Sequence, residues 1–163
     1  AWERGDTDTA LRHLDRALGV LRKAPESALY QGVLFNKAMV LNDAGRDRAA
    51  LPLLLQVERL RIRTLGPSHP RIGDTRRLIG EVQAALGQDT AARASLRDAV
   101  RLTRESREYG PSHPHTRRAE LSLAMFELDH DEPAPETETT ATETTATMVA
   151  LQKLAALPKS DQE

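Results

Sequence analysis

The sequence predicts an all-α protein, built as a solenoid of antiparallel helix hairpins. Three observations predict this fold: a composition that favours helix, apolar residues at spacings of three and four, and a repeat of about forty residues. Alanine, leucine and arginine dominate the 163 residues, and aromatic residues make up only 3%. A β-sandwich or barrel would need β-branched and aromatic residues in alternation, so the composition favours helices instead.

Two independent landmarks report the repeat. The sequence GPSHP at residues 66–70 recurs at residues 110–114, 44 residues later. Gly5, Gly45 and Gly87 form the second landmark, 40 and 42 residues apart. Each glycine is followed five residues later by alanine, and twelve residues later by a small or compact residue; these are Ala10, Ala50 and Ala92, then Ala17, Val57 and Ala99. A fixed period of this length is typical of stacked helical repeats.

Six helices follow from apolar residues that recur every three or four positions and so form one buried stripe per helix. We expect them near 6–23 (Leu11, Leu14, Leu18, Leu21), 27–43 (Leu34, Ala38, Leu41), 46–64 (Leu53, Leu54, Val57, Leu60), 70–86 (Ile72, Ile79, Val82, Leu86), 88–107 (Leu96, Ala99, Val100, Leu102) and 114–128 (Leu121, Ala124, Met125, Leu128).

The turns between these helices carry their own signals. Gly45 and Gly87 suit tight helix-to-helix corners that need a positive φ, and the alanines beyond them leave room for a neighbouring backbone. In the GPSHP loops, glycine can end one helix, proline suits the first position of the next, and serine or histidine serves as the N-cap. We therefore interpret His69 and His113 as turn residues. A metal site at His113 and His115 is a weak alternative, because no acidic or thiol partner lies nearby in the sequence.

Charge divides the chain near Asp129. Residues 1–128 hold 21 Lys and Arg against 16 Asp and Glu, whereas residues 129–163 hold 2 against 8. The net charge of −1 gives no overall attraction to nucleic acid or membranes, so neither is an expected partner. The chain has no cysteine, no apolar run of the roughly 18 residues that a membrane span needs, and no signal peptide, so a cytoplasmic protein is expected.

The two ends of the chain differ from its middle. The first repeat enters just before its corner, so its first helix is missing; we expect a fragment whose cut face, near Trp2, was covered by a neighbour. Residues 1–128 form the repeats. Residues 129–147 lack large apolar residues and are expected to be a disordered acidic linker, in which seven threonines are candidate phosphate acceptors. Residues 148–158 form a short amphipathic stretch that would cap the solenoid or enter its groove.

Paired helices with small residues at fixed offsets resemble the tetratricopeptide repeat, whose ordinary period is about 34 residues. The longer period here, with LGPSHP between pairs, is similar to the kinesin-light-chain type, over residues 3–128. Such repeats also occur in bacterial multidomain proteins, including regions C-terminal to serine/threonine kinase domains. The resemblance implies a right-handed superhelix whose first helices line a concave groove that holds a peptide or partner segment.

The resemblance also implies which residues face that groove. They are Phe35, Asn36, Met39 and Asn42 in the first complete repeat, Arg77 and Glu81 in the next, and Arg118, Leu121, Ser122 and Met125 in the last. Asn36 matches an asparagine that the family uses to bind a peptide backbone. Arg76 and Gln83 depart from the family pattern, which normally has large apolar residues there, and this predicts a register shift of one. Pro52 is tolerable only in the first turns of its helix.

The paired arginines 76–77 and 117–118 lie on successive first helices. If both pairs face inward, they form a basic strip suited to an acidic or phosphorylated segment; a solvated charged face is the alternative reading.

No sequence pattern of an enzyme is present, and no cofactor is expected. We therefore expect a non-catalytic scaffold that binds a peptide or protein segment. One alternative is a regulatory region at the C-terminal side of a signalling enzyme such as a bacterial serine/threonine kinase, with the acidic tail folding back on the arginine-rich repeats. The other is self-association through the cut N-terminal face.

Overall fold

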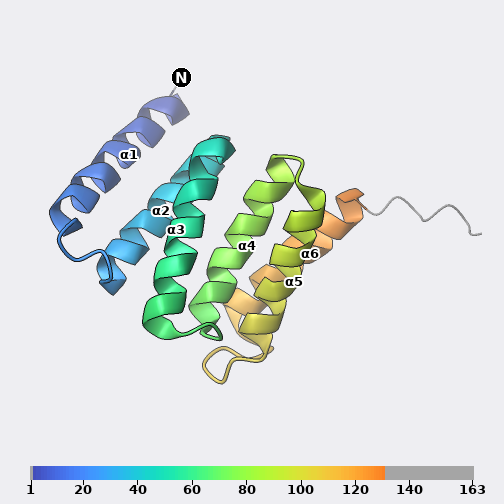
Figure 1. Cartoon of the computed structure of the whole chain (residues 1–163). Helices are drawn as coiled ribbons and strands as arrows, with labels where there is room; N and C mark the ends of the chain where they lie inside the picture. Colours follow the sequence, from blue (N-terminus) through green and yellow to red (C-terminus); the bar gives the residue numbers. More distant parts are fainter. Residues whose placement is uncertain (1, 131–163) are drawn as a thin grey trace, which may run out of the picture. The chain divides into compact units, whose positions relative to one another are not determined.

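A computed structural model describes residues 2–130, with side chains from Asp6 onward, and contains six α-helices and no strand in that range. Figure 1 shows the helices following one another in chain order. Their bounds are α1 Trp2–Leu21, α2 Ala28–Asp43, α3 Asp47–Leu65, α4 Pro70–Ala85, α5 Asp89–Arg104 and α6 Pro114–His130. The expected linker and the amphipathic stretch at 148–158 lie outside the described residues, apart from Asp129 and His130.

Helices that are adjacent in sequence pack against each other, which makes α2–α3 and α4–α5 hairpins and leaves α6 as the first helix of a third. Across hairpins, α2 contacts α4 and α4 contacts α6, whereas α1, α3 and α5 do not contact one another within residues 2–130. The first helices therefore form one layer and the second helices another. Neighbouring helices of one layer lie closer together among α2, α4 and α6 than among α1, α3 and α5. We call the layer of α2, α4 and α6 the inner layer.

The hairpin corners have the predicted backbone. Gly45 and Gly87 have φ of 68° and 71°, in the left-handed region that only glycine adopts without strain. After Gly45 the Arg46 amide bonds back to the Leu41 carbonyl, so the corner also satisfies free carbonyls at the end of α2.

Both GPSHP loops start the next helix as predicted. The His69 ring accepts a hydrogen bond from the Arg71 amide at 3.2 Å, and the His113 ring accepts one from the His115 amide at the same distance. Histidine rather than serine is therefore the N-cap, and α4 and α6 begin at Pro70 and Pro114. Gly66 has a positive φ of 88°, but its ψ of 158° is extended rather than left-handed helical.

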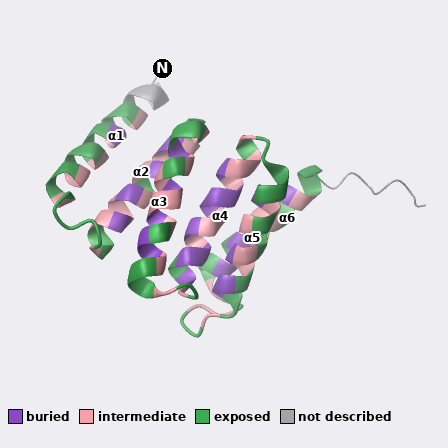
Figure 2. Ribbon diagram, in the orientation of Figure 1, coloured by how far each residue is buried: buried purple, intermediate pink, exposed green. Residues whose placement is uncertain are grey.

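Buried residues, purple on the ribbon in Figure 2, occur in the helices of both layers. The largest cluster joins four helices, from α1 to α4; its members are Leu11, Ala38, Leu41, Ala50, Leu54, Leu78, Ile79 and Val82. A smaller cluster of Ala92, Leu96 and Phe126 joins α5 to α6. Leu78, Ile79 and Val82 of α4 are all buried, whereas Arg76 and Gln83 are half-buried, and the predicted shift of register stays a prediction.

The α4–α5 pair is packed exceptionally closely. A Cβ added to Gly80 would lie 2.6 Å from the Leu96 Cγ, and one added to Gly73 would lie 2.7 Å from the Thr103 Cγ2. Ala92 and Ala99, which the sequence predicted to allow a close approach, are fully buried on the facing side of α5. The two glycines are seven residues apart, so two helical turns place them on the same face of α4.

Three predictions about the helices were wrong. Helix α1 begins at Trp2, so Gly5 lies within its first turns and not at a corner. Helix α5 ends at Arg104 because Ser106 turns the chain there, its hydroxyl accepting from the Glu108 and Tyr109 amides. The buried residues of α6 are Thr116, Ala119 and Phe126, since these face α4 and α5; the expected stripe of Leu121, Ala124, Met125 and Leu128 is exposed. Pro52 sits exposed in the second turn of α3.

Candidate partner-binding face

The α2 part of the inner layer presents polar and flexible side chains. Asn36 is exposed, Met39 is 36% exposed, and Asn42 is half-buried. Phe35 is different, because it packs against the largest core cluster and against a smaller one of Leu34, Val57 and Leu60 in α2 and α3. Its ring lies 4.8 Å from the Arg61 guanidinium carbon. Of the four residues that the resemblance placed here, Asn36 and Met39 are the most accessible to a ligand.

A polar link joins α4 to α6 on the same layer. The Arg77 guanidinium pairs with the Glu81 carboxylate one turn later, and the Ser122 hydroxyl donates to the same carboxylate at 2.6 Å. Only 13% of the Arg77 side chain is exposed. Glu81 therefore holds one group from its own helix and one from the next hairpin, which fixes the distance between α4 and α6 at this point.

An apolar cavity of about 260 Å³ opens beside this link. Its floor is made of Ala84, Leu96, Met125 and Phe126, and its rim carries polar or charged groups of Glu81, Ser122, Asp129 and His130. Three helices therefore contribute to it: α4, α5 and α6. Glu81, Ser122 and Met125 were placed in the groove from the sequence, and the structure brings all three to this cavity.

The remaining predicted residues lie on α6. Arg118 is exposed, and Leu121 and Met125 are 60% and 57% exposed. Met125 faces the cavity shared with α4, whereas Leu121 lies outside it. Of these two apolar residues of α6, Met125 therefore lines the cavity and Leu121 does not.

The basic strip, one of the two readings of the paired arginines, is not formed. The Arg76 guanidinium pairs with Glu58 of α3, at 2.7 Å, and with Asp98 of α5. Both partners belong to the second helices, so Arg76 points away from the inner layer while Arg77 stays on it. Adjacent side chains in a helix point about 100° apart, so Arg76 and Arg77 cannot both lie on the inner layer. Gln83 is also satisfied on that side, where its side-chain oxygen accepts from the Ser95 hydroxyl.

A buried arginine ties α3 to α4. Arg61 is 7% exposed, and its Nη1 donates to the Arg71 carbonyl and the Thr75 hydroxyl, each at 2.8 Å. Burial lowers its pKa, and the Asp74 carboxylate opposes that shift. With Phe35 stacked beneath it, Arg61 supports the inner layer at α2 rather than forming part of an exposed surface.

A second polar cluster holds the start of α6 to α4. The Asp74 carboxylate accepts from the Tyr109 hydroxyl at 3.2 Å and lies 2.7 Å from the Nδ1 atom of His115. Burial, and then the charge of Asp74, raises the pKa of Tyr109 to about 12. The Tyr109 ring stacks on His113 with centroids 4.1 Å apart. Within residues 6–130, no group of three or more His, Asp or Glu side chains is arranged to hold a metal ion.

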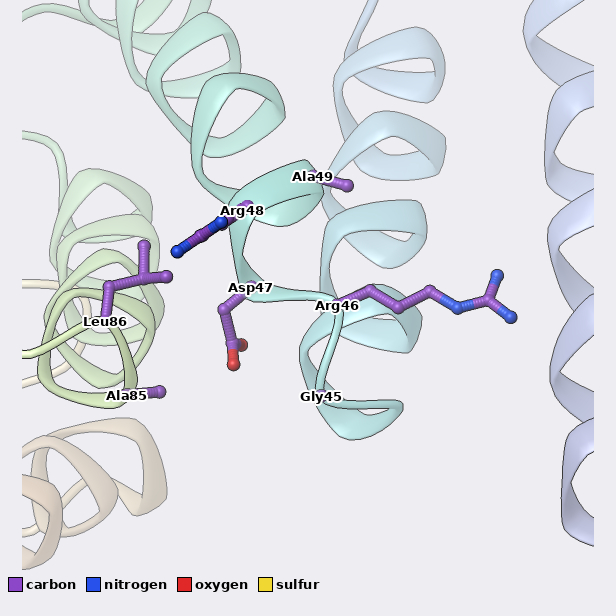
Figure 3. Close-up of a pocket in the computed structure, with 7 residues that line it drawn as sticks. All are labelled: Gly45, Arg46, Asp47, Arg48, Ala49, Ala85 and Leu86. Atoms are coloured by element: carbon purple, nitrogen blue, oxygen red, sulfur yellow. The ribbon is translucent and has the colours of Figure 1, made fainter.

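Another cavity, of about 580 Å³, lies at the corner between α2 and α3, beside the end of α4 (Figure 3). Arg48 extends toward Leu86, whereas Arg46 points away toward α1, where it pairs with Asp8 at 2.9 Å. One carboxylate oxygen of Asp47 is buried without a hydrogen-bond partner among the described residues. This corner contains none of the residues predicted for the groove.

Sequence reasoning missed several residues that shape this face. The seven-residue spacing of Gly73 and Gly80 was a detectable signal for close helix packing. The link from Ser122 to Glu81 and the cation–π contact of Arg61 had no local signal, since each joins residues on different helices.

The match to a known protein family begins and ends close to helix boundaries. A family model described as tetratricopeptide repeat matches residues 29–105, which run from the start of α2 to the end of α5. Residues 29–105 are therefore similar in sequence to the tetratricopeptide repeat (TPR) family. TPR units of this kind are non-catalytic scaffolds that generally mediate protein–protein interaction.

Two solved structures show the same fold. One contains the nearly identical TPR-like repeats of a Podosopora anserina protein named as a kinesin light chain; it is 20% identical, covers 96% of this chain and 71% of its own, and has a TM-score of 0.66. A single-substitution variant of it is also 20% identical, with 94% and 70% covered and a TM-score of 0.67. No curated protein matches this chain. No helix in the described range is long and apolar enough to cross a membrane.

Proposed function

We propose that this TPR chain binds a segment of a partner protein non-covalently on the inner layer of α2, α4 and α6. The observation that carries the proposal is the cavity between α4 and α6. It combines an apolar floor with oriented polar groups at the rim, which is the usual composition of a binding site.

The size of the cavity indicates what it holds. Sites for small molecules usually measure about 300–1,000 Å³. A cavity of about 260 Å³ is smaller, and it suits one apolar side chain of a longer segment. Asn36 and Met39 on α2 then serve as further contacts, an amide for the backbone of the segment and a flexible apolar surface for its next side chain.

The charges around the cavity favour a particular partner sequence. Asp129 is on its rim, so a basic or neutral residue of the partner is favoured next to the inserted side chain. Arg77 is already paired with Glu81, and Arg76 faces the other layer. An acidic or phosphorylated residue of the partner would therefore be placed near Arg118, at the exposed start of α6, and not along a continuous strip.

Selection from a random peptide library on the full chain tests this proposal. We expect selected peptides to share one large apolar residue. Met125→Glu, which places a charge in the cavity, should weaken their binding at least tenfold when measured by fluorescence anisotropy. The double variant Asn36→Ala with Arg77→Ala should weaken binding as well, because it removes an exposed amide on α2 and the partner that holds Glu81 beside the cavity.

The matched control is Val20→Glu, which makes the same type of change at an α1 residue that is 79% exposed and outside the inner layer. It should leave peptide affinity unchanged, and circular dichroism should show that all variants keep their helices. If no peptide is selected, or if Met125→Glu binds peptide as tightly as the unchanged chain, the cavity is not the binding site.

The regulatory alternative rests on the charge difference between residues 1–128 and 129–163. If the acidic tail competes for the arginine-rich repeats, raising the salt concentration should increase the affinity of a neutral peptide, since salt screens that attraction. A peptide affinity that does not depend on salt would reject this alternative while leaving the scaffold function intact.

A further inference from the structure

Helix α6 has a broad apolar face that nothing covers within residues 2–130. Leu121 is 60% exposed and Leu128 is 82% exposed, and Ala124 between them is also exposed. These three residues are spaced by three and four, so they lie in one row along the helix. The face looks away from Phe126 and Ala119, which are buried against the preceding hairpin.

The corresponding face of α4 shows which element packs at this position in a complete hairpin. The GPSHP duplication relates α4 to α6 by 44 residues, so Gly80 corresponds to Ala124 and Gly73 to Arg117. In α4 these two positions are covered by α5, which lies so close that an added Cβ at either glycine would clash. The open face of α6 is therefore the face on which a hairpin's second helix packs.

In α3 and α5, the second helices of their hairpins, the buried residues have the same spacing. The second, third and fourth of them follow the first by 4, 7 and 10 positions. These residues are Ala50, Leu54, Val57 and Leu60 in α3, and Ala92, Leu96, Ala99 and Leu102 in α5. Residues 131–163 lie outside the described part of the chain. Their sequence contains the same spacing once more, as Thr147, Leu151, Leu154 and Leu157.

We propose that residues 147–157 supply the second helix of the third hairpin and pack on the open face of α6. Matching Leu151 to Leu96 places Leu151 at Ala124 and Pro158 at the position of Thr103. Thr103 is the residue that approaches Gly73 most closely. The helix therefore ends at Pro158, where Arg117 replaces that glycine and would obstruct a longer helix.

The chain between the two helices is long enough for this return. Sixteen residues, 131–146, separate α6 from Thr147 and can span about 50 Å when extended, twice the roughly 25 Å length of α6. A longer loop adds little to the closure cost, because that cost rises only with the logarithm of loop length. A second copy of the chain, or a helix of another protein, is the competing occupant of the face.

Engineered disulfides test the proposal in the full chain, which has no cysteine of its own. Ala124→Cys combined with Leu151→Cys should form an intramolecular disulfide in oxidised glutathione. Ala124→Cys combined with Gln152→Cys is the matched control, because one residue along a helix turns the side chain by about 100°. We expect the first pair to close at least tenfold faster, measured by mass spectrometry of the protein.

Each other outcome overturns the proposal. Equal closure rates for the two pairs would mean that the segment passes α6 without docking on it. Disulfide-linked dimers at micromolar concentration would show that a second copy covers the face instead.

Hydrogen exchange supplies an independent measurement without cysteines. Leu151→Asp with Leu154→Asp should speed amide exchange in α6 at least tenfold, because the covering helix is lost. The control Gln152→Asp with Ala156→Asp changes the opposite side of the segment and should leave exchange unchanged. If α6 exchanges equally fast in the unchanged chain and in both variants, nothing from this chain covers it.

Discussion

The close contact between α4 and α5 gives the sharpest prediction about stability. In Gly80→Ala the new Cβ would lie 2.6 Å from the Leu96 Cγ and 3.2 Å from the Ala92 carbonyl oxygen. Carbon atoms prefer about 3.5–4.0 Å, so α5 must move by roughly 1 Å. Inserting a methyl group into such a well-packed contact costs about 1–3 kcal/mol. Alanine offsets part of this cost, because it is favoured over glycine in helices by about 0.8–1.0 kcal/mol.

Gly32→Ala provides the matched control. Gly32 lies inside α2, and a Cβ there would meet no atom within 4 Å, so only the helix-propensity gain remains. The propensity terms cancel between the two variants, and Gly80→Ala should be less stable than Gly32→Ala by the packing cost alone, about 1–3 kcal/mol. Urea unfolding followed by circular dichroism measures both values. If Gly80→Ala is stabilised as much as Gly32→Ala, the helices are not as close as described.

Three further predictions concern the supports of the inner layer. Arg61→Ala should destabilise the chain by about 2–3 kcal/mol in urea unfolding, because it leaves the Thr75 hydroxyl without its donor and opens a gap over the Phe35 ring; an unchanged midpoint would contradict this role. Gly87→Ala should cost about 1–2 kcal/mol from backbone strain alone, since its φ is positive and no atom lies near its Cβ; a neutral result would mean that the corner has another conformation. Stability should fall as pH rises from 10 to 12, because folded Tyr109, with its pKa of about 12, keeps a proton that the unfolded chain loses near pH 10. Tyr109→Phe should flatten that fall, and an equal slope in both proteins would contradict the raised pKa of Tyr109.

The sequence was sufficient for the parts of the fold that depend on local chemistry. Corners at Gly45 and Gly87 need a positive φ, and proline after histidine starts a helix, so these features follow from the residues themselves. The order of helix pairs also followed, because the duplication reports the period directly.

What the sequence could not show depends on which neighbour each helix has. The apolar stripe on α6 suggested a buried face, but the residues buried against α4 and α5 are Thr116, Ala119 and Phe126. The direction of Arg76 was equally hidden, since Glu58 and Asp98 lie 18 and 22 residues away in sequence. The cavity beside Glu81 forms only when three helices meet, so no single segment signals it.

A footprint of a bound peptide on the backbone amides of the full chain tests the binding proposal most directly. Nuclear magnetic resonance of a selected peptide in complex should shift amides in α2, α4 and α6, with the largest shifts around Glu81, Ser122 and Met125. Shifts confined to α3 and α5, or to the corner cavity between Gly45 and Leu86, would show that the chain binds its partner on a different face.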